Sequence, residues 1–229
     1  MAVSSKVIRF PASEERPAKR MRRRVTNVDG VKYFTGQQIK LLRRTARDHA
    51  ELDRSKGKVT GVREWMAIDL LTSTGLRVSE AANVRCGDVK AGYGESAVFI
   101  RDGKGSRSRT VQIPDSLKKH VKRFLKWKQE RGEGTGPDDH LFIGQRGPWT
   151  AQAVQQAVKK HLRALGLYES GKSVHALRHS YALELYRQER DLRAVQKQLG
   201  HASVQTTQIY ADVTQDDIQG QIKGLWGQK

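Results

Sequence analysis

The sequence predicts an α+β fold that is mainly helical and carries a small antiparallel β-sheet on one side. Most of the chain beyond residue 30 places apolar residues three and four positions apart, which is the period of an amphipathic helix. Two short runs near residue 100 instead alternate apolar and polar residues around a glycine-containing turn, as in a β-hairpin. Because 229 residues with 37% hydrophobic content can bury one good core, we expect a single domain over residues 31–229.

The first element is a basic arm over residues 1–30, which we expect to be flexible. It holds eight Lys and Arg residues against three acidic ones, includes Pro11 and Pro17, and shows almost no apolar periodicity. A solvated or nuclear-import-like tail has the same composition. A basic segment ahead of a basic domain more often adds contacts to phosphate groups.

Two helices are expected after the arm. Thr35 is predicted to cap a helix that runs through about Ala50, and residues 51–59 are predicted to end it. The segment Val62–Thr74 predicts the most buried helix of the chain, because its large apolar residues leave little polar face. Gly75 is expected to stop that helix.

Arg77 comes directly after the glycine break and precedes a helix predicted over Val78–Val84. Glu80 lies three residues further on, where its carboxylate can fix the guanidinium. A plain surface salt bridge is the alternative. The position between apolar helices favours an Arg that is held rigidly to bind an anion.

The two predicted strands are Ala97–Arg101 and Arg109–Ile113. Lys104 lies between two glycines in the turn that joins them, so its backbone is permissive and its long side chain can reach into a groove. Taken alone, Lys104 is more simply explained as an ordinary exposed turn lysine.

Further elements follow the hairpin. Pro114 is expected to open an amphipathic helix, residues 131–139 a loop, and His140–Gly144 an edge strand. Another amphipathic helix is predicted over Thr150–Leu165, and its polar face is either solvated or reads a nucleic-acid groove. That face includes Gln152, Gln155, Gln156, Lys159 and Lys160.

The segment after residue 172 has a regular helical rhythm. If Ser173 caps a helix, His175 and Arg178 project from one face of its first turn. Apolar residues at spacings of three and four then predict a short core-facing helix over Leu192–Leu199, and Gly200 is expected to end it.

His201 lies on the following turn, and Tyr210 comes nine residues later, beyond a short polar helix begun by residues 202–203. An Arg, two His and a Tyr in one segment suit phosphodiester transfer, because cations hold phosphate oxygens, imidazoles move protons and a phenol oxygen attacks. A helix-turn-helix over residues 192–210 is an alternative that leaves the upstream His and Arg unexplained.

Composition limits the class of protein. The formal net charge of +19 indicates a polyanionic partner, most simply a nucleic acid. The single cysteine, Cys86, excludes an internal disulfide and a multi-cysteine zinc site, and it fits a reducing cytoplasm. The sequence contains no apolar run as long as the roughly 18 residues of a membrane span.

The tail over about residues 214–227 is predicted to form a weak helix. Ile218, Ile222, Leu225 and Trp226 give it an apolar stripe, whereas three glycines weaken it. A helix this poor must dock onto something to exist. Docking on its own core and docking on a neighbouring copy both remain open.

Five motifs occur in order: TGLRVSE at 74–80, GKG at 103–105, HALR at 175–178, LGH at 199–201, and Tyr210. Together they resemble the catalytic domain of the tyrosine recombinases, the family of the phage integrases and Xer-type enzymes. The resemblance covers roughly residues 35–225. It implies a site-specific DNA recombinase that cuts and rejoins DNA through a 3′-phosphotyrosyl intermediate.

The resemblance also implies a role for each phosphate-binding residue. Arg77 and Arg178 are expected to clamp the scissile phosphate, and His201 to donate a hydrogen bond to it. Glu80 is expected to be the buried acidic partner of Arg77.

The remaining roles concern the proton transfers and the nucleophile. His175 is expected to accept a proton, Lys104 to protonate the leaving 5′ oxygen, and Tyr210 to become linked to the 3′ phosphate. Because Arg, Lys and imidazole groups provide the charge stabilisation that a metal ion provides in a nuclease, we expect no metal and no cofactor.

The resemblance implies double-stranded DNA with paired recombination sites as the partner. We expect a homotetramer on DNA, a monomer or weak oligomer without it, possible accessory DNA-bending proteins, and a cytoplasmic, nucleoid-associated location. We expect no separate core-binding domain, as in the similarly short fimbrial DNA invertases. The candidate DNA-binding residues are Lys19, Arg20, Arg22, Arg23, Arg24, Arg107, Lys159 and Lys160.

Two other functions are compatible with these residues. One is a DNA-binding regulator that keeps the fold without strand exchange, and the other is a topoisomerase of type IB. Among recombinases, integration, excision, inversion and resolution all remain possible outcomes, because the outcome depends on the number and orientation of the sites.

Overall fold

The N-terminal part of the fold is a helical hairpin followed by a short third helix. The computed structural model of the protein describes residues 31–101, 108–170, 172, 174–201 and 205–212. Helix α2 spans Gly36–Ser55, α3 spans Thr60–Thr74 and α4 spans Val78–Asn83. The basic arm and the tail lie outside the described residues, as do residues 102–107, Ser173 and residues 202–204.

Helix α2 begins as predicted and ends later than predicted. The Thr35 hydroxyl accepts a hydrogen bond from the Gln38 amide at 3.1 Å, and the Gln38 side chain accepts one from the Thr35 amide at 3.0 Å. The helix continues past Ala50 to Ser55, so the predicted break at residue 51 is wrong. Asp53 explains the extension, because it is buried and its carboxylate accepts a hydrogen bond from the Gly61 amide at 2.8 Å.

The small sheet has three antiparallel strands in the order β1 (Val89–Lys90), β2 (Ala97–Ile100) and β3 (Arg109–Gln112). The predicted hairpin is present, with Val98 opposite Val111 in its register. The first strand was not predicted, because two residues are too few to show an alternating pattern. Strand β1 pairs with the outer edge of β2, so β2 is central.

The predicted edge strand over His140–Gly144 is largely wrong. His140 forms an isolated antiparallel bridge to Arg85, and a strand pair forms between β4 (Ile143–Gly144) and β5 (Gly147–Pro148). The preceding carbonyl groups bind the buried Lys128 ammonium instead of a strand, with the His140 oxygen at 2.9 Å and the Leu141 oxygen at 3.3 Å.

The other helices lie close to their predicted bounds. They are α5 (Asp115–Glu130), α6 (Ala151–Ala164), α7 (Val174–Glu189), α8 (Leu192–Leu199) and α9 (Gln205–Asp212). Pro114 and Thr150 occupy the positions before α5 and α6, and the Thr150 hydroxyl accepts a hydrogen bond from the Ala153 amide.

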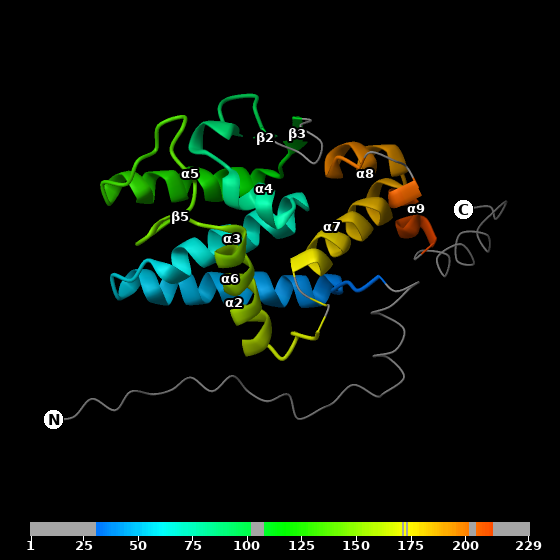
Figure 1. Cartoon of the computed structure of the whole chain (residues 1–229), viewed down its shortest axis with the longest axis horizontal. Coiled ribbons are helices and arrows are strands. Elements are labelled where there is room, and N and C mark those ends of the chain that lie inside the picture. The colour runs from blue at the N-terminus through cyan, green and yellow to red at the C-terminus, as the bar shows by residue number, and fades with distance from the viewer. Residues whose placement is uncertain (1–30, 102–107, 171, 173, 202–204, 213–229) are drawn as a thin grey trace, which may run out of the picture.

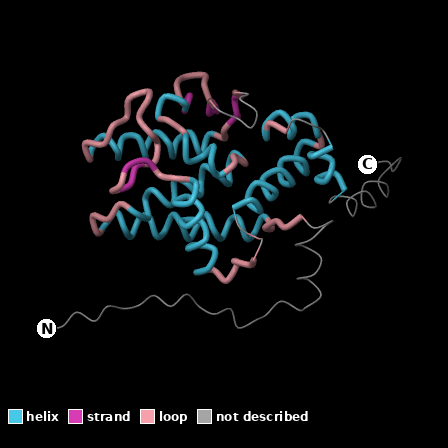
Figure 2. The backbone as a smooth tube through the Cα atoms, viewed as in Figure 1, coloured by secondary structure: helices cyan, strands magenta, loops and turns pink. Residues whose placement is uncertain are grey.

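Helix α3 is the central element of the fold. Every residue from Met66 to Thr74 is buried, and the helix contacts α2, α4, α5, α6 and α7. Figure 1 shows α7, α8 and α9 together at one end of the molecule, and Figure 2 shows how little of the backbone is strand. The core has a main cluster around α3 and a smaller one where α7, α8 and α9 meet.

Among the described residues, no helix combines the length and apolar character that crossing a membrane requires.

Candidate active site

Arg77 and Glu80 form the first part of the site, at the junction of α3 and α4. The Arg77 amide donates to one Glu80 oxygen at 2.8 Å, and its guanidinium donates to the other at 2.7 Å. The contact expected between these two residues is therefore present. Glu80 is buried, whereas about a quarter of the Arg77 side chain is exposed. Its guanidinium can therefore still bind an anion.

Arg109, which the sequence did not single out, completes this arrangement. It lies at the start of β3, and its two terminal nitrogens donate to the two Glu80 oxygens at 2.8 Å each. Burial by itself raises the pKa of Glu80, but hydrogen bonds from Arg109 and Arg77 outweigh it and lower that pKa to about 2. A single carboxylate thus orients two arginines from distant parts of the chain.

Arg178 projects from the first turns of α7 into the same region. Its guanidinium donates to the Gly75 carbonyl at 2.7 Å and to the Leu199 carbonyl at 2.8 Å. Burial and the charge of Arg77 lower its pKa to about 10, so it keeps its charge at neutral pH. The ends of α3 and α8 thus hold a buried cation without neutralising it.

Two glycines allow these close approaches. Gly75 and Gly200 end α3 and α8 with φ angles of 63° and 67°. A Cβ on Gly75 would lie 2.5 Å from the Tyr181 ring, and one on Gly200 would lie 2.6 Å from the Arg109 side chain. Any larger residue at position 200 would therefore displace the Arg109 side chain that binds Glu80.

His201 follows Gly200 directly. Its Nδ1 lies 3.0 Å from the Thr207 hydroxyl, and its carbonyl accepts a hydrogen bond from the Gln196 side chain. Burial and then the charges of Arg178 and Arg77 lower its pKa to about 4, so the ring is neutral at pH 7. When the Thr207 hydroxyl donates to Nδ1, Nε2 carries the proton and can donate it in a hydrogen bond.

Tyr210 lies on α9 in the smaller core cluster, packed with Tyr33, Leu183, Val195 and Leu199. Only 1% of its surface is exposed. Burial raises the pKa of its hydroxyl to about 12, although the charge of Arg178 acts in the opposite direction. The phenol is therefore protonated and shielded from solvent in this conformation.

His179 is the histidine that contacts the Tyr210 hydroxyl, with its Nδ1 at 3.0 Å. Burial, followed by the charges of Arg178 and His175, lowers the pKa of His179 to about 4. The unprotonated nitrogen of a neutral imidazole can accept a hydrogen bond from the phenol. One signal in the sequence could have indicated His179, namely its adjacency to Arg178, but only the fold brings it to Tyr210.

The remaining predicted site residues are either outside the described part of the chain or differ in exposure. Lys104, Arg107 and the five arm residues lie outside the described part of the chain. His175 is exposed, whereas Arg178 on the same helical turn is buried. Lys159 is partly exposed, and Lys160 binds both carboxylate oxygens of Glu64, at 2.9 and 3.0 Å.

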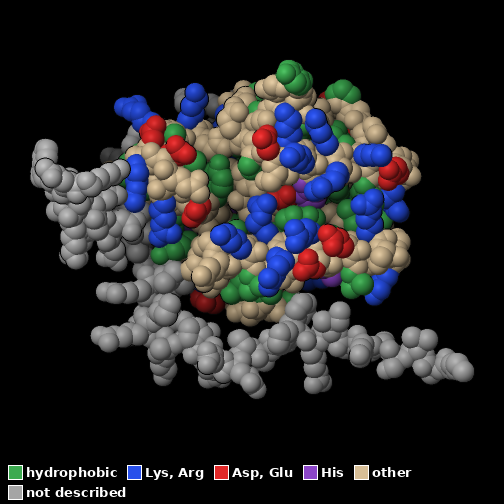
Figure 3. Space-filling model, turned by 180° about the vertical axis from the view of Figure 1, so that it is seen from behind, with side chains coloured by type: hydrophobic (Ala, Val, Ile, Leu, Met, Phe, Trp, Pro, Cys, Tyr) green, Lys and Arg blue, Asp and Glu red, His purple; other side chains and the backbone are tan. Residues whose placement is uncertain are grey.

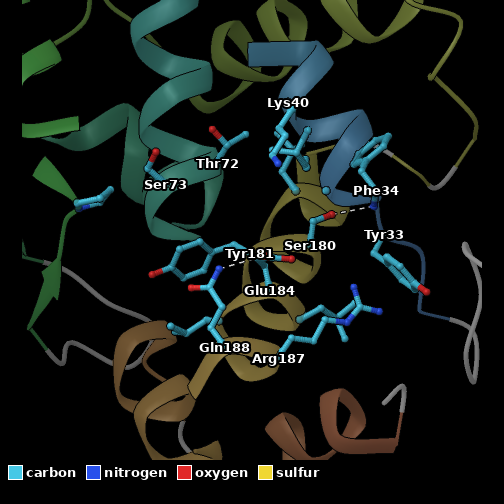
Figure 4. Close-up of a pocket in the computed structure, with 16 residues that line it drawn as sticks. Tyr33, Phe34, Lys40, Thr72, Ser73, Ser180, Tyr181, Glu184, Arg187 and Gln188 are labelled. Atoms are coloured by element: carbon cyan, nitrogen blue, oxygen red, sulfur yellow. Dashed lines mark hydrogen bonds between the residues drawn. The ribbon is translucent and has the colours of Figure 1, made fainter. Parts of the chain in front are cut away.

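A groove of about 360 Å³ lies beside the site, between the start of α2, the end of α3 and one face of α7. Figure 4 shows Tyr33 and Phe34 on one wall and Tyr181 on another, with the Phe34 amide donating to the Ser180 hydroxyl at 2.7 Å. Tyr33 and Leu183 line this groove and also pack in the cluster that contains Tyr210. The groove is thus continuous with the packing around Tyr210.

The surface around the fold is strongly basic. Figure 3 shows Lys and Arg side chains spread over one face of the molecule, with fewer Asp and Glu side chains among them. Positive charge is therefore a property of the folded body as well as of the predicted arm.

Curated relatives share about a third of their residues with the chain. Tyrosine recombinase XerD of Staphylococcus saprophyticus is 33% identical over 162 residues, which are 70% of this chain and 54% of that protein. Tyrosine recombinase XerA of Pyrococcus furiosus is 34% identical over 154 residues, or 67% of this chain and 51% of that protein. The chain spans about half the length of the curated relatives it matches.

Solved structures match the fold. A XerA recombinase has a TM-score of 0.68 and 26% identity, covering 89% of this chain and 67% of that one. A post-cleavage complex of XerH with its palindromic difH substrate has a TM-score of 0.68 and 25% identity, covering 87% and 56%. The catalytic domain of bacteriophage HP1 integrase, at 18% identity and a TM-score of 0.54, shows the fold alone, covering 83% and 93%.

The family model described as the phage integrase family matches residues 32–216. These residues include the cluster of arginines and histidines around Tyr210. The chain therefore belongs to the phage integrase family, and its fold is that of a tyrosine recombinase catalytic domain.

Proposed function

We propose that this protein is a site-specific DNA recombinase that cuts and rejoins double-stranded DNA at paired sites through a 3′-phosphotyrosyl intermediate. The proposal rests on one observation: the Tyr210 hydroxyl and two histidines lie close to three arginines. Glu80 is the one carboxylate that binds any of these arginines in the described site. Such an excess of fixed positive charge suits a phosphate group.

In the proposed step the Tyr210 oxygen attacks the scissile phosphorus, and the bond between phosphorus and the 5′ oxygen breaks. The phenol proton passes to a histidine, and Lys104 supplies a proton to the leaving 5′ oxygen. Arg77, Arg178 and His201 stabilise the charge on the nonbridging oxygens. The energy of the phosphodiester is kept in the phosphotyrosine, so a 5′ hydroxyl can later reverse the step without ATP.

Two histidines are candidates for accepting the phenol proton. The resemblance to the family assigns this role to His175, whereas the 3.0 Å contact with the Tyr210 hydroxyl belongs to His179. Because Tyr210 is buried, we propose that α9 shifts on DNA binding to expose the hydroxyl. His179 holds the phenol before that shift, and His175 accepts its proton afterwards.

We further propose that the active assembly is a homotetramer on DNA, located on the nucleoid in the cytoplasm, with accessory DNA-bending proteins at some sites. The tail after Asp212 is proposed to dock in the groove of a neighbouring copy. The groove suits it, because Phe34, Ile39 and Leu185 line it and the tail carries an apolar stripe. Such docking would allow cleavage only when sites are paired.

The test is a two-site assay on supercoiled plasmids. The plasmids carry two copies of the DNA that flanks the gene, in direct or inverted orientation, and a control plasmid carries none. A recombinase is expected to delete or invert the segment between the sites. Relaxation of all plasmids without rearrangement would instead indicate a topoisomerase, and binding without any strand exchange would indicate a regulator.

A further inference from the structure

Three potential metal ligands lie together at the opposite end of α3 from the active site. They are His49 on α2, Glu64 on α3 and His161 on α6. The Glu64 carboxylate lies 2.9 Å from His161 Nε2 and 3.9 Å from His49 Nδ1. One donor atom from each residue falls within 4.8 Å of the others.

The His49 Nδ1 atom forms no hydrogen bond within the described part of the protein. The atom is buried, and it has no hydrogen-bond partner among the described residues. The rest of the ring is about one-third exposed, and its centroid lies 5.5 Å from that of His161 in an edge-to-face arrangement. Nδ1 thus lies beside the Glu64 carboxylate and the His161 ring without a hydrogen bond to either.

We propose that His49, Glu64 and His161 bind a divalent transition-metal ion, for which Zn²⁺ is the natural probe. Two imidazole nitrogens and a carboxylate oxygen are a donor set that zinc accepts, with bonds of about 2.0–2.2 Å. Ligand atoms around one such ion lie about 3–3.5 Å apart, so small side-chain rotations bring the three donors into range. Mg²⁺ and Ca²⁺ prefer oxygen donors and fit this set poorly.

The surroundings support the donor set. The Asp53 carboxylate lies 4.0 Å from His49 Nε2, where it can orient the ring so that Nδ1 faces Glu64. Asp53 also binds the Gly61 amide at 2.8 Å. A Cβ on Gly61 would lie 2.8 Å from both the His49 and the Asp53 side chains, so this glycine lets α2 and α3 approach closely enough.

Lys160 competes with the metal for Glu64. Its ammonium donates to both carboxylate oxygens and is therefore the cation that balances Glu64 in the protein alone. About half of the Lys160 side chain is exposed, so it can move into solvent when a metal binds. Glu64 and Lys160 also line a surface cavity, together with Ala157, so water can reach the Glu64 carboxylate and serve as a fourth ligand.

The proposed metal acts on stability and not on cleavage. It joins α2, α3 and α6, whereas Gly75 lies at the other end of α3, about 17 Å from Glu64 by helical rise, and Arg77 lies beyond it. No spacing in the sequence could reveal the site, because its ligands come from three separate helices. It is therefore independent of the proposed recombinase function.

The test is zinc binding by metal-free full-length protein, measured by equilibrium dialysis with metal analysis and by thermal unfolding. One Zn²⁺ per chain is expected, with Tm raised by about 5–10 °C at a free concentration one hundredfold above Kd. His49→Gln is expected to weaken binding at least tenfold in dialysis, a readout that does not depend on the Tm of the metal-free variant.

Two further variants separate this site from other histidines. Lys160→Met is expected to bind Zn²⁺ more tightly than the wild type, since it removes the competing cation. His201→Gln is expected to bind one Zn²⁺ with unchanged affinity. The proposal is overturned if wild-type protein binds no stoichiometric Zn²⁺, if His49→Gln binds it equally well, or if binding is lost in His201→Gln.

Discussion

The Glu80 carboxylate receives hydrogen bonds from two guanidinium groups and one backbone amide. Replacing it with Gln leaves Arg77 and Arg109 close together with no counter-charge. We expect Glu80→Gln to lower the free energy of unfolding by about 3–5 kcal/mol, the usual cost of breaking a buried ion pair on one side. Urea denaturation measures the loss.

A matched carboxylate-to-amide change is available on the surface. Asp138 binds Arg85 and Arg101, but about three-quarters of its side chain is exposed. Asp138→Asn is therefore expected to cost no more than about 1 kcal/mol. If Glu80→Gln is no less stable than Asp138→Asn, Glu80 does not organise the arginines.

His179 makes stability depend on pH. Its pKa in the folded protein is about 4, below the 6.5 of a free histidine, so between these values the unfolded chain binds a proton that the folded chain does not. The contribution of His179 to the free energy of unfolding is therefore present in full above pH 6.5. It is lost as the pH drops towards 4, by up to about 1.4 kcal/mol per pH unit.

Removing this titration tests the assignment. His179→Gln keeps a side chain that can bond to Tyr210 but cannot be protonated. Urea denaturation at several pH values between 4.5 and 6.5 gives the change of unfolding free energy with pH. This change is expected to be smaller in His179→Gln than in the wild type, by an amount that corresponds to at most one proton. The contribution of His201 remains in both proteins. An unchanged slope would mean that His179 is not held neutral by the fold.

Among the elements, the β2–β3 hairpin matters most for the chemistry. Ile100 and Arg109 pair at the end of the hairpin where the connecting segment joins the two strands, and Arg109 binds Glu80, which binds Arg77. The segment that carries Lys104 thus starts and ends close to the arginine site, which supports its proposed role as general acid.

The role of Lys104 can be tested through the leaving group. Lys104→Ala is expected to cleave ordinary DNA at least a hundredfold more slowly, which is a typical contribution of general acid catalysis. A 5′-bridging phosphorothiolate needs little protonation on leaving, so cleavage by the variant should recover on that substrate. A variant that stays slow with sulfur in the bridge would identify Lys104 as a phosphate contact only.

The proposed docking of the tail in the groove of a neighbouring copy can also be tested. Truncation after Val213 is expected to leave a folded protein that binds one site and fails to bridge two, because the proposed contact between copies is lost. Leu185→Gln, which places an amide in the groove, is expected to give the same defect in the full chain. Gel shift and light scattering with two-site DNA measure both effects.

Each contrary result has a defined meaning. If the truncated protein still assembles synaptic tetramers, the tail does not join the copies. If truncation unfolds the protein, the tail docks on its own core instead. If Leu185→Gln assembles normally, the groove is not the docking surface.

For the molecule as a whole, the sequence predicts the local features better than the long-range ones. The spacing of apolar residues predicted the helices, and Gly75 and Gly200 predicted the ends of α3 and α8. Both kinds of pattern extend over only a few neighbouring residues. The pairing of Arg77 with Glu80 was also local. The structure added Arg109 and His179, whose partners are 29 and 31 residues away.

The errors have the same physical origin. Strand β1 is too short to show a period, and the residues before β4 give their carbonyl groups to Lys128. The end of α2 depends on a bond from Asp53 to the start of α3. In the last two cases side-chain bonds to another element decided the local conformation, and apolar periodicity does not report such bonds.

The central claim is that the arginine and histidine cluster serves Tyr210 as a nucleophile. The most direct measurement uses a nicked DNA duplex containing the recombination site, in which cleavage releases a short fragment and traps the covalent product. The adduct is detected on a denaturing gel and its attachment point by mass spectrometry. Wild-type protein should give an adduct on Tyr210, and Tyr210→Phe should bind the DNA equally well and give none; an adduct formed by Tyr210→Phe, or mapped to another residue in the wild type, would contradict the account.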